Sequence, residues 1–219
     1  MLTQKKKVDK ILPSFPILSE DLLLLDKLFS GDTQIFDALI KEGDYTGLNV
    51  EDIRINDSSL QNITFDVSNF LRLYISNSVI EHCSLANTNF SGAKLSTVAF
   101  TDCRLTGLQL NDAYTDDLQF IECKADYLQF QHVKVNRLQF KNCNLMNAYF
   151  QGSDLSGAIF RNCDLSDSDF SGCRLKGADF RGSKIFGMKV DPKDLRGALF
   201  DSSQIYYLCA LLGILIEDL

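Results

Sequence analysis

The segment Asn144–Lys184 reads NLMNAYFQGSDLSGAIFRNCDLSDSDFSGCRLKGADFRGSK and places an apolar residue at every fifth position. Leu145, Phe150 and Leu155 begin this series, and a smaller residue such as Ala148 stands two positions before each of them. A helix repeats every 3.6 residues and a strand every two, so neither sustains a strict period of five. An internal repeat of this length decides the fold before any catalytic motif is considered.

The same period extends outward from this segment, from about residue 50 to residue 205. In each pentad, two inward residues flank one outward residue, which is the alternation of a strand held for only three residues. The pentad then continues with polar residues or glycine, as at Ser156-Gly157 and Lys176-Gly177, which suit a tight turn. The pattern therefore predicts a short strand and a corner, repeated until the chain closes on itself.

Two series of inward residues recur every twenty positions, which predicts four pentads in each coil. They form an expected core ladder of Cys83, Cys103, Cys123, Cys143 and Cys163 together with Phe100, Phe120, Phe140, Phe160, Phe180 and Phe200. Stacked strands lie about 4.8 Å apart, so about eight coils would give a rod on the order of 40 Å long. Side chains would fill its narrow interior.

Three units resemble the A(D/N)LXX repeat of pentapeptide-repeat proteins: Ser91-Gly92-Ala93-Lys94-Leu95, Ser156-Gly157-Ala158-Ile159-Phe160 and Lys176-Gly177-Ala178-Asp179-Phe180. The resemblance covers roughly residues 45–205. It implies a mainly β fold, a right-handed quadrilateral β-helix. We expect an N-terminal helical cap over residues 1–48, the β-helix over residues 49–203, and a C-terminal helix and strand over residues 204–219.

The middle of the repeat departs from this pattern. Thr115 and Ala125 are small for central positions, and six residues that stand two positions earlier in their pentads are large: Val98, Leu108, Leu118, Leu128, Val133 and Leu138. One interpretation is a repacked, slightly wider coil. The other is a kink or groove that a partner uses.

The cysteine content favours reduced thiols in a cytoplasmic protein. The chain has seven cysteines, an odd number, and inward cysteine behaves as a small hydrophobic residue. A disulfide between stacked neighbours is the alternative, because a Cα spacing of about 5 Å lies within disulfide range. We expect no signal peptide after Lys5-Lys6-Lys7 and no contact with a membrane, since the apolar run Leu208–Ile216 is far shorter than a membrane span.

The ends of the rod need covers, because a β-helix leaves strand edges unpaired there. Residues 19–31 and 32–43 each combine a capping residue, an apolar face and a terminal glycine, which predicts two short amphipathic helices. These helices either cap the first coil or bind a partner.

The C-terminal tail predicts an interface. Asp201 can cap a helix over residues 204–212, Gly213 ends it, and Ile214–Ile216 reads as a strand. One face would cap the last coil, and a second subunit would cover the other. This tail resembles the C-terminal helix of the quinolone-resistance pentapeptide-repeat proteins, which implies a homodimer. The expected dimer interface is Tyr206, Tyr207, Leu208, Leu211, Leu212, Ile214 and Leu215.

Residues suited to catalysis do not converge in the sequence. His82 and His132 fall at outward turn positions without a converging partner, and Asp116-Asp117 reads as a solvated corner. Lys193 occupies an inward slot, so we expect its pentad to bulge and leave the ammonium group in water. We therefore predict no enzyme activity, cofactor, metal site or small-molecule substrate.

The sequence favours a protein-interaction or structural rod whose protein partner it does not identify. The alternative is a DNA mimic that modulates a type II topoisomerase, DNA gyrase. The net charge of −7 supports the mimic. Against it, residues 49–205 carry 16 basic and 19 acidic residues, and the two signs are intermixed at the outward positions. Lys134, Arg137, Arg174, Lys176 and Arg196 share one predicted face. Binding of nucleic acid is not expected at this acidity, because it requires a basic footprint.

Overall fold

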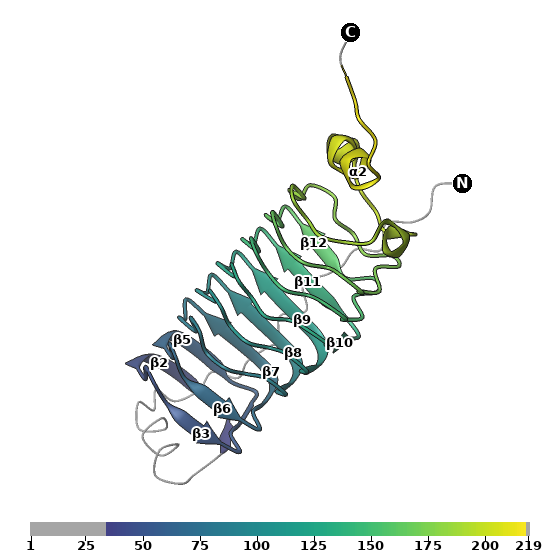
Figure 1. The fold of residues 1–219 in the computed structure, drawn as a ribbon. Coiled ribbons are helices and arrows are strands. Elements are labelled where there is room, and N and C mark those ends of the chain that lie inside the picture. Colours follow the sequence, from purple (N-terminus) through teal and green to yellow (C-terminus); the bar gives the residue numbers. More distant parts are fainter. Residues whose placement is uncertain (1–33, 218–219) are drawn as a thin grey trace, which may run out of the picture.

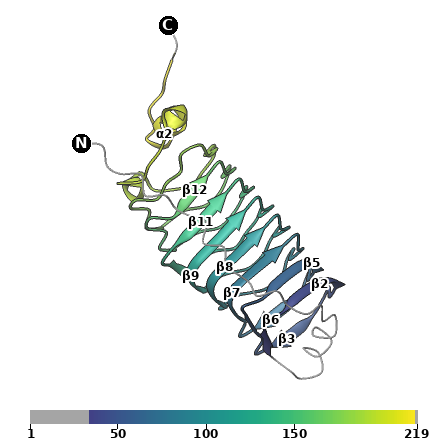
Figure 2. The ribbon, with the colours of Figure 1, turned by 180° about the vertical axis from the view of Figure 1, so that it is seen from behind.

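The computed structural model describes residues 34–217, and within them the chain winds into a straight stack of coils (Figure 1). Each coil contributes short strands to parallel ladders that run along the length of the rod, as the view from behind also shows (Figure 2). The strands are β1 (Gln34–Phe36), β2 (Leu39–Asp44), β3 (Asn49–Glu51), β4 (Arg54–Asn56), β5 (Ser59–Thr64), β6 (Asn69–Leu71), β7 (Tyr74–Glu81), β8 (Lys94–Thr101), β9 (Tyr114–Ile121), β10 (Lys134–Val135), β11 (Leu138–Lys141) and β12 (Ile159–Arg161). The fold is mainly β, a β-solenoid, as the pentad pattern predicts.

Every pairing between coils joins residues twenty positions apart. Ile55 pairs with Ile75, which in turn pairs with Leu95, and Phe100 pairs with Phe120. This register confirms four pentads per coil. Within residues 34–217, the longest path through the main sheet joins seven strands, β1-β4-β7-β8-β9-β11-β12. Counted by these strands, the solenoid has slightly fewer turns than the eight expected, and isolated bridges extend the register to Leu199.

The backbone conformation at the corner of the pentads explains why polar residues and glycine recur there. The second residue after most central residues adopts a positive φ, for example Asn142 at 55° and Asp167 at 58°. Glycine, asparagine and aspartate tolerate this left-handed conformation best, so the turn favours those residues. The two inward residues of each pentad then meet at the axis, where the core forms one continuous cluster.

The phenylalanines of the core stack along the axis. Phe120 and Phe140 have ring centroids 4.5 Å apart with planes 6° apart, and Phe160 and Phe180 lie 5.1 Å apart at 4°. Phe150 and Phe170 form a second stack on the adjacent wall, with centroids 4.6 Å apart. Rings of the two walls meet edge to face, which is a favourable aromatic geometry.

The prediction of a helix over residues 32–43 is wrong for its described part. Most of residues 34–43 belong to β1 and β2, which pair with β4 and β5. Ile35 and Ile40 are buried as inward residues of an earlier coil, because they already keep the five-residue period. The other predicted helix, over residues 19–31, lies outside the described residues.

The degenerate middle keeps its packing with one local exception. The large residues two positions before the centres, such as Leu118 and Leu128, are fully buried. Val135, a central residue, is only half-buried. The corner that follows it, at Asn136 and Arg137, lacks the positive φ that Asp117 has one coil earlier. A pocket of about 190 Å³ lies at this corner, and both interpretations of the middle stay predictions.

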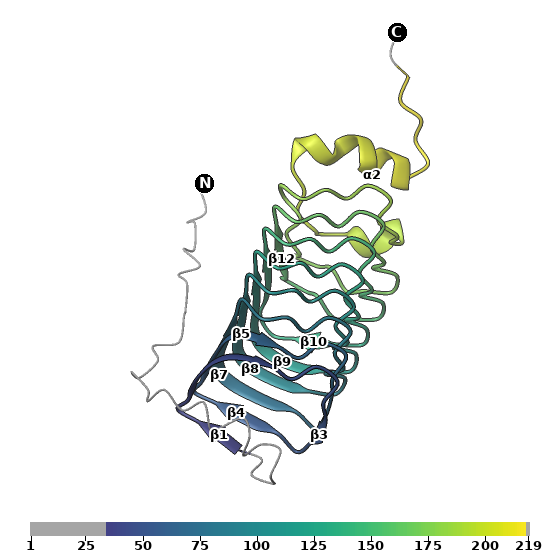
Figure 3. The same ribbon diagram turned by 90° about the vertical axis from the view of Figure 1, so that its left-hand side faces the viewer.

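The C-terminal end has two short 3-10 helices, η1 (Pro192–Leu195) and η2 (Ser202–Gln204), and one α-helix, α2 (Ile205–Leu211). Helix α2 lies across the end of the coil stack (Figure 3). The pentad of Lys193 bulges into η1 and exposes its side chain, as expected. The predicted strand at Ile214–Ile216 is wrong, because no neighbouring strand among the described residues pairs with it.

Candidate interaction surfaces

Helix α2 is anchored to the last coil through a buried glutamine. Gln204 donates hydrogen bonds from Nε2 to the carbonyl oxygens of Phe180 at 2.8 Å and Ser183 at 2.7 Å. Its Oε1 accepts the backbone N–H of Asp201, whose side chain in turn accepts the N–H of Ser203. This capping box fixes where the helix begins. The tail is therefore held in a defined position on the rod.

The seven residues of the predicted dimer interface separate into two groups. Leu208 and Leu211 are partly buried and pack against the hydrophobic core. The other five are exposed, and among them Tyr206 is 58% exposed, Leu212 61% and Leu215 87%. Ile205 and Ile216, which the prediction did not include, extend the exposed apolar surface. The helix thus caps the last coil with one side and exposes the other.

A cleft of about 280 Å³ runs between α2 and the last coils. Its walls include Phe186, Met188, Tyr207 and Leu211. The rings of Phe186 and Tyr207 meet edge to face with centroids 5.9 Å apart. Because Phe186 is itself 62% exposed, the apolar surface of the tail continues onto the side of the solenoid.

The residues of the core ladder lie inside the rod, away from any surface. Phe100, Phe120, Phe140, Phe160 and Phe180 are fully buried, whereas Phe200 is partly buried. The five ladder cysteines are buried and carry free thiols. The Cys103 thiol donates to the carbonyl oxygens of Ile80 and Thr101, each at 3.3 Å. At Cys173, which lies on another wall, burial raises the pKa of the thiol to about 12.

Many charges on the outer walls pair with a charge of opposite sign on the neighbouring coil. Arg72 binds Asp52 at 2.6 Å, and Lys184 binds Asp164 at 3.0 Å. The prediction that His82 has no partner is wrong, because its Nδ1 lies 3.0 Å from Asp102 Oδ2 one coil away. Across residues 34–217, no group of three or more histidine, cysteine, aspartate or glutamate side chains could hold a metal ion.

A second surface was missed by the sequence analysis. On one side wall, Arg54, Tyr74, Lys94, Tyr114 and Lys134 form a single column, and Asn56, Ser76, Ser96 and Asp116 form the column beside it. Together they line a groove of about 550 Å³, here called the basic–aromatic groove. Tyr74 and Tyr114 are forty residues apart and alternate with basic residues in the same register. This alternation is the feature of the sequence that indicates the column.

Comparison with known proteins gives two family matches. The family model described as pentapeptide repeats matches residues 143–182 in eight copies, and the model described as a pentapeptide repeat region matches residues 53–130. Together the matches cover more than half of the chain. A comparison with curated proteins gives no match. Within the described residues, no helix has the length and hydropathy needed to cross a membrane.

The solved structures that resemble the chain include one whose description names a pentapeptide repeat protein. A trypsin-treated form of QnrB1, a plasmid-mediated fluoroquinolone resistance protein, shares 19% identity over 80% of this chain and 100% of that chain, with a TM-score of 0.49. HetL, a pentapeptide repeat protein involved in heterocyst differentiation regulation in the cyanobacterium Nostoc, shares 18% identity over 82% of this chain and 96% of that chain, with a TM-score of 0.27.

Proposed function

The chain belongs to the pentapeptide-repeat family, and from this premise we propose that it is a non-enzymatic interaction rod that pairs end to end through its C-terminal tail. The observation that carries the proposal is the exposed apolar side of the tail, from Tyr206 to Ile216. Large apolar patches on a soluble surface mark interaction sites. Each Å² of apolar surface removed from water contributes about 25 cal/mol.

A second copy of the chain is the partner that this surface fits best. The patch lies at the end of the rod, where a two-fold axis could bring it against itself without obstruction by the coils. Gln204 anchors the start of α2 to the last coil, which would reduce the ordering needed on association. The stacked phenylalanine rings fill the axis, which supports a structural role for the solenoid.

The DNA-mimic hypothesis receives less support from the described surface. A mimic should reproduce the dense and regular negative charge of a duplex. Here several aspartates are paired with basic residues of neighbouring coils, as Asp154 is with Arg174 at 3.3 Å. The basic–aromatic groove adds unpaired cations on one wall. We therefore prefer the interaction rod over a modulator of DNA gyrase.

Sedimentation velocity on the full chain tests the proposal. At tens of micromolar we expect a dimer, and Leu212→Asp should give a monomer, because it would bury a carboxylate without a partner. Val67→Asp is the matched control: Val67 is 64% exposed, close to the 61% of Leu212, but lies near the other end of the rod. This variant should remain dimeric. A monomeric parent protein, or a dimer that Leu212→Asp leaves intact, would contradict the proposal.

A further inference from the structure

The basic–aromatic groove follows from the register of the coils. Arg54 pairs with Tyr74, Tyr74 with Lys94, Lys94 with Tyr114, and Tyr114 with Lys134. Since successive coils lie about 4.8 Å apart, the side chains of this column alternate between cation and aromatic ring along the axis of the rod. The repeat therefore builds a straight, periodic surface without any specialised loop.

The cations of the groove lie outside the ion pairs of the outer walls. Arg54, Lys94 and Lys134 form no ion pair with any residue that the structure describes, in contrast to Arg174 farther along the same wall. Arg54 and Lys94 instead lie over the ring of Tyr74, at 5.1 Å and 4.8 Å from its centroid. These cation–π contacts hold both side chains in place but leave their positive charge available to a ligand.

The opposite wall of the groove is polar and almost uncharged. Asn56, Ser76 and Ser96 present amide and hydroxyl groups, which can hydrogen-bond to an extended peptide backbone. Asp116 is the acidic residue in this wall, and it accepts a hydrogen bond from Asn136 at 2.9 Å and lies 3.8 Å from Arg137. The groove as a whole thus favours an anionic ligand, although the chain has a net charge of −7.

The spacing of the cations selects the conformation of that ligand. Arg54, Lys94 and Lys134 are two coils apart, which is about 9.6 Å. Every third residue of a polyproline II helix recurs after about 9.3 Å. Every second residue of an extended strand recurs after only about 6.8 Å, and two turns of an α-helix take about 10.8 Å. Of these three conformations, the polyproline II helix fits the cation spacing best.

The aromatic residues of the column suit the same ligand. Tyr114 lies between Lys94 and Lys134 and is 64% exposed, so its ring is open to a partner. Proline-rich segments in the polyproline II conformation dock into grooves lined by aromatic residues, because they lose little entropy on binding. A nucleic acid is disfavoured, since three free cations on an acidic protein do not make the broad basic footprint that it requires.

We propose that the basic–aromatic groove binds an acidic, proline-rich segment of a partner protein in the polyproline II conformation, with a carboxylate at every third residue. Successive carboxylates would contact Arg54, Lys94 and Lys134, and prolines would pack between them on the tyrosine rings. This inference names a partner for the proposed interaction rod. It can fail separately from the end-to-end dimer, because the groove and the tail lie on different parts of the molecule.

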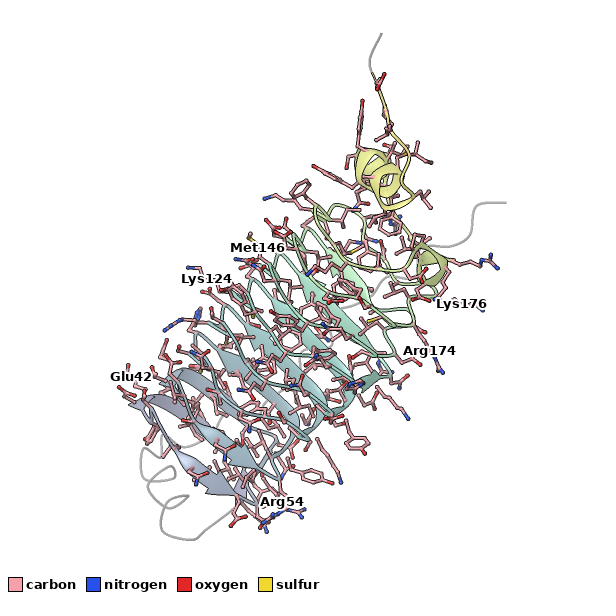
Figure 4. The ribbon with its side chains drawn as sticks, viewed as in Figure 1. Glu42, Arg54, Lys124, Met146, Arg174 and Lys176 are labelled. Carbon is pink, nitrogen blue, oxygen red and sulfur yellow. The ribbon has the colours of Figure 1, made fainter. Side chains whose placement is uncertain are left out.

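Fluorescence anisotropy with a labelled peptide of four Glu-Pro-Pro triplets, at about 50 mM salt, tests the inference. We expect saturable binding that weakens as salt rises, because exposed charges are screened. The double variant Lys94→Glu with Lys134→Glu should weaken binding by at least about tenfold. Lys124→Glu is the matched control, since Lys124 is also exposed but projects on the opposite side of the rod from Arg54 and Arg174 (Figure 4).

Three further arms make the outcome decisive. A peptide of four Glu-Gly-Gly triplets carries the same charge without the preformed helix and should bind several-fold more weakly. The Leu212→Asp variant should bind the Glu-Pro-Pro peptide as the parent does, which separates the groove from the dimer. The proposal is overturned if the Glu-Pro-Pro peptide does not bind, if the double variant binds it equally, or if an oligothymidylate binds more tightly than the peptide.

Discussion

At the scale of single residues, a serine or cysteine two positions before a centre can join consecutive coils. The Ser153 hydroxyl donates to the carbonyl oxygen of Phe130 at 2.7 Å and accepts the backbone N–H of Val133 at 2.9 Å. Cys83 accepts the N–H of Ile63 at 3.4 Å in the same way. Serine and cysteine recur at these positions because they combine small volume with an acceptor for a buried N–H, which would otherwise be unsatisfied.

Replacement of Ser153 by alanine should therefore destabilise the protein by about 1–2 kcal/mol, because it leaves the N–H of Val133 without a partner. Ser168→Ala is the control. Ser168 is equally buried, but its hydroxyl only donates to the carbonyl of Leu165, which the N–H of Ser168 already contacts. Urea unfolding followed by circular dichroism measures both. Equal losses in the two variants would contradict the role given to the Ser153 hydroxyl.

Asp179 is a buried carboxylate held by two arginines. Burial alone would raise its pKa, but hydrogen bonds from Arg181 and Arg161 outweigh this effect and lower the pKa to about 2. An unfolded aspartate titrates near pH 3.9. The stabilisation from Asp179 is thus complete above about pH 4 and is lost as the pH falls towards 2.

The variant Asp179→Asn should be less stable than the parent by about 1–2 kcal/mol at pH 7, because charge-assisted hydrogen bonds are lost. The difference should shrink as the pH is lowered from 4 to 2, where the parent loses the same charge. Asp102→Asn serves as control, since the Asp102–His82 pair is exposed and contributes little. A stability difference that does not change over this range would show that the charge of Asp179 is not responsible.

At the scale of the elements, the phenylalanine stack is the main cohesive feature of the solenoid. Phe140 is fully buried, and its ring stacks between those of Phe120 and Phe160, with centroid distances of 4.5 Å and 5.3 Å. Phe140→Ala should cost roughly 3–5 kcal/mol through lost burial and the cavity that remains. Phe200→Ala should cost less than half of that, because Phe200 is only partly buried at the end of the stack. Chemical denaturation measures the loss of unfolding free energy in both variants. A greater loss for Phe200→Ala than for Phe140→Ala would contradict this account of the stack.

The strands show both the reach and the limit of the sequence pattern. The period of five and the twenty-residue recurrence were sufficient to predict the coils, because the same positions of every coil hold the inward residues. The pattern did not separate helix from strand at residues 34–43. Ile35, Phe36, Leu39 and Ile40 satisfy a helical spacing, but Ile35 and Ile40 also keep the pentad. Only pairing with β4 and β5 decides between the two. The half-burial of Val135 likewise depends on its corner, which no local signal marked.

At the scale of the whole molecule, the rod offers two different surfaces. The apolar tail could be predicted from its composition, although the division between inward Leu208 and outward Leu212 needed the position of α2. The basic–aromatic groove could not be predicted as a surface. The register places its residues in one column, but which cations remain unpaired depends on side-chain positions, since Arg174 on the same wall finds Asp154 and Lys94 finds a tyrosine ring.

The central claim is that two rods join end to end through the tail, and small-angle X-ray scattering of the full chain tests it most directly. At tens of micromolar, the account predicts a particle with the cross-section of one solenoid and nearly twice its length, since stacked coils add about 4.8 Å each. Leu212→Asp should halve the length and leave the cross-section unchanged. A parent particle of single length, or one that is wider rather than longer, would contradict the account.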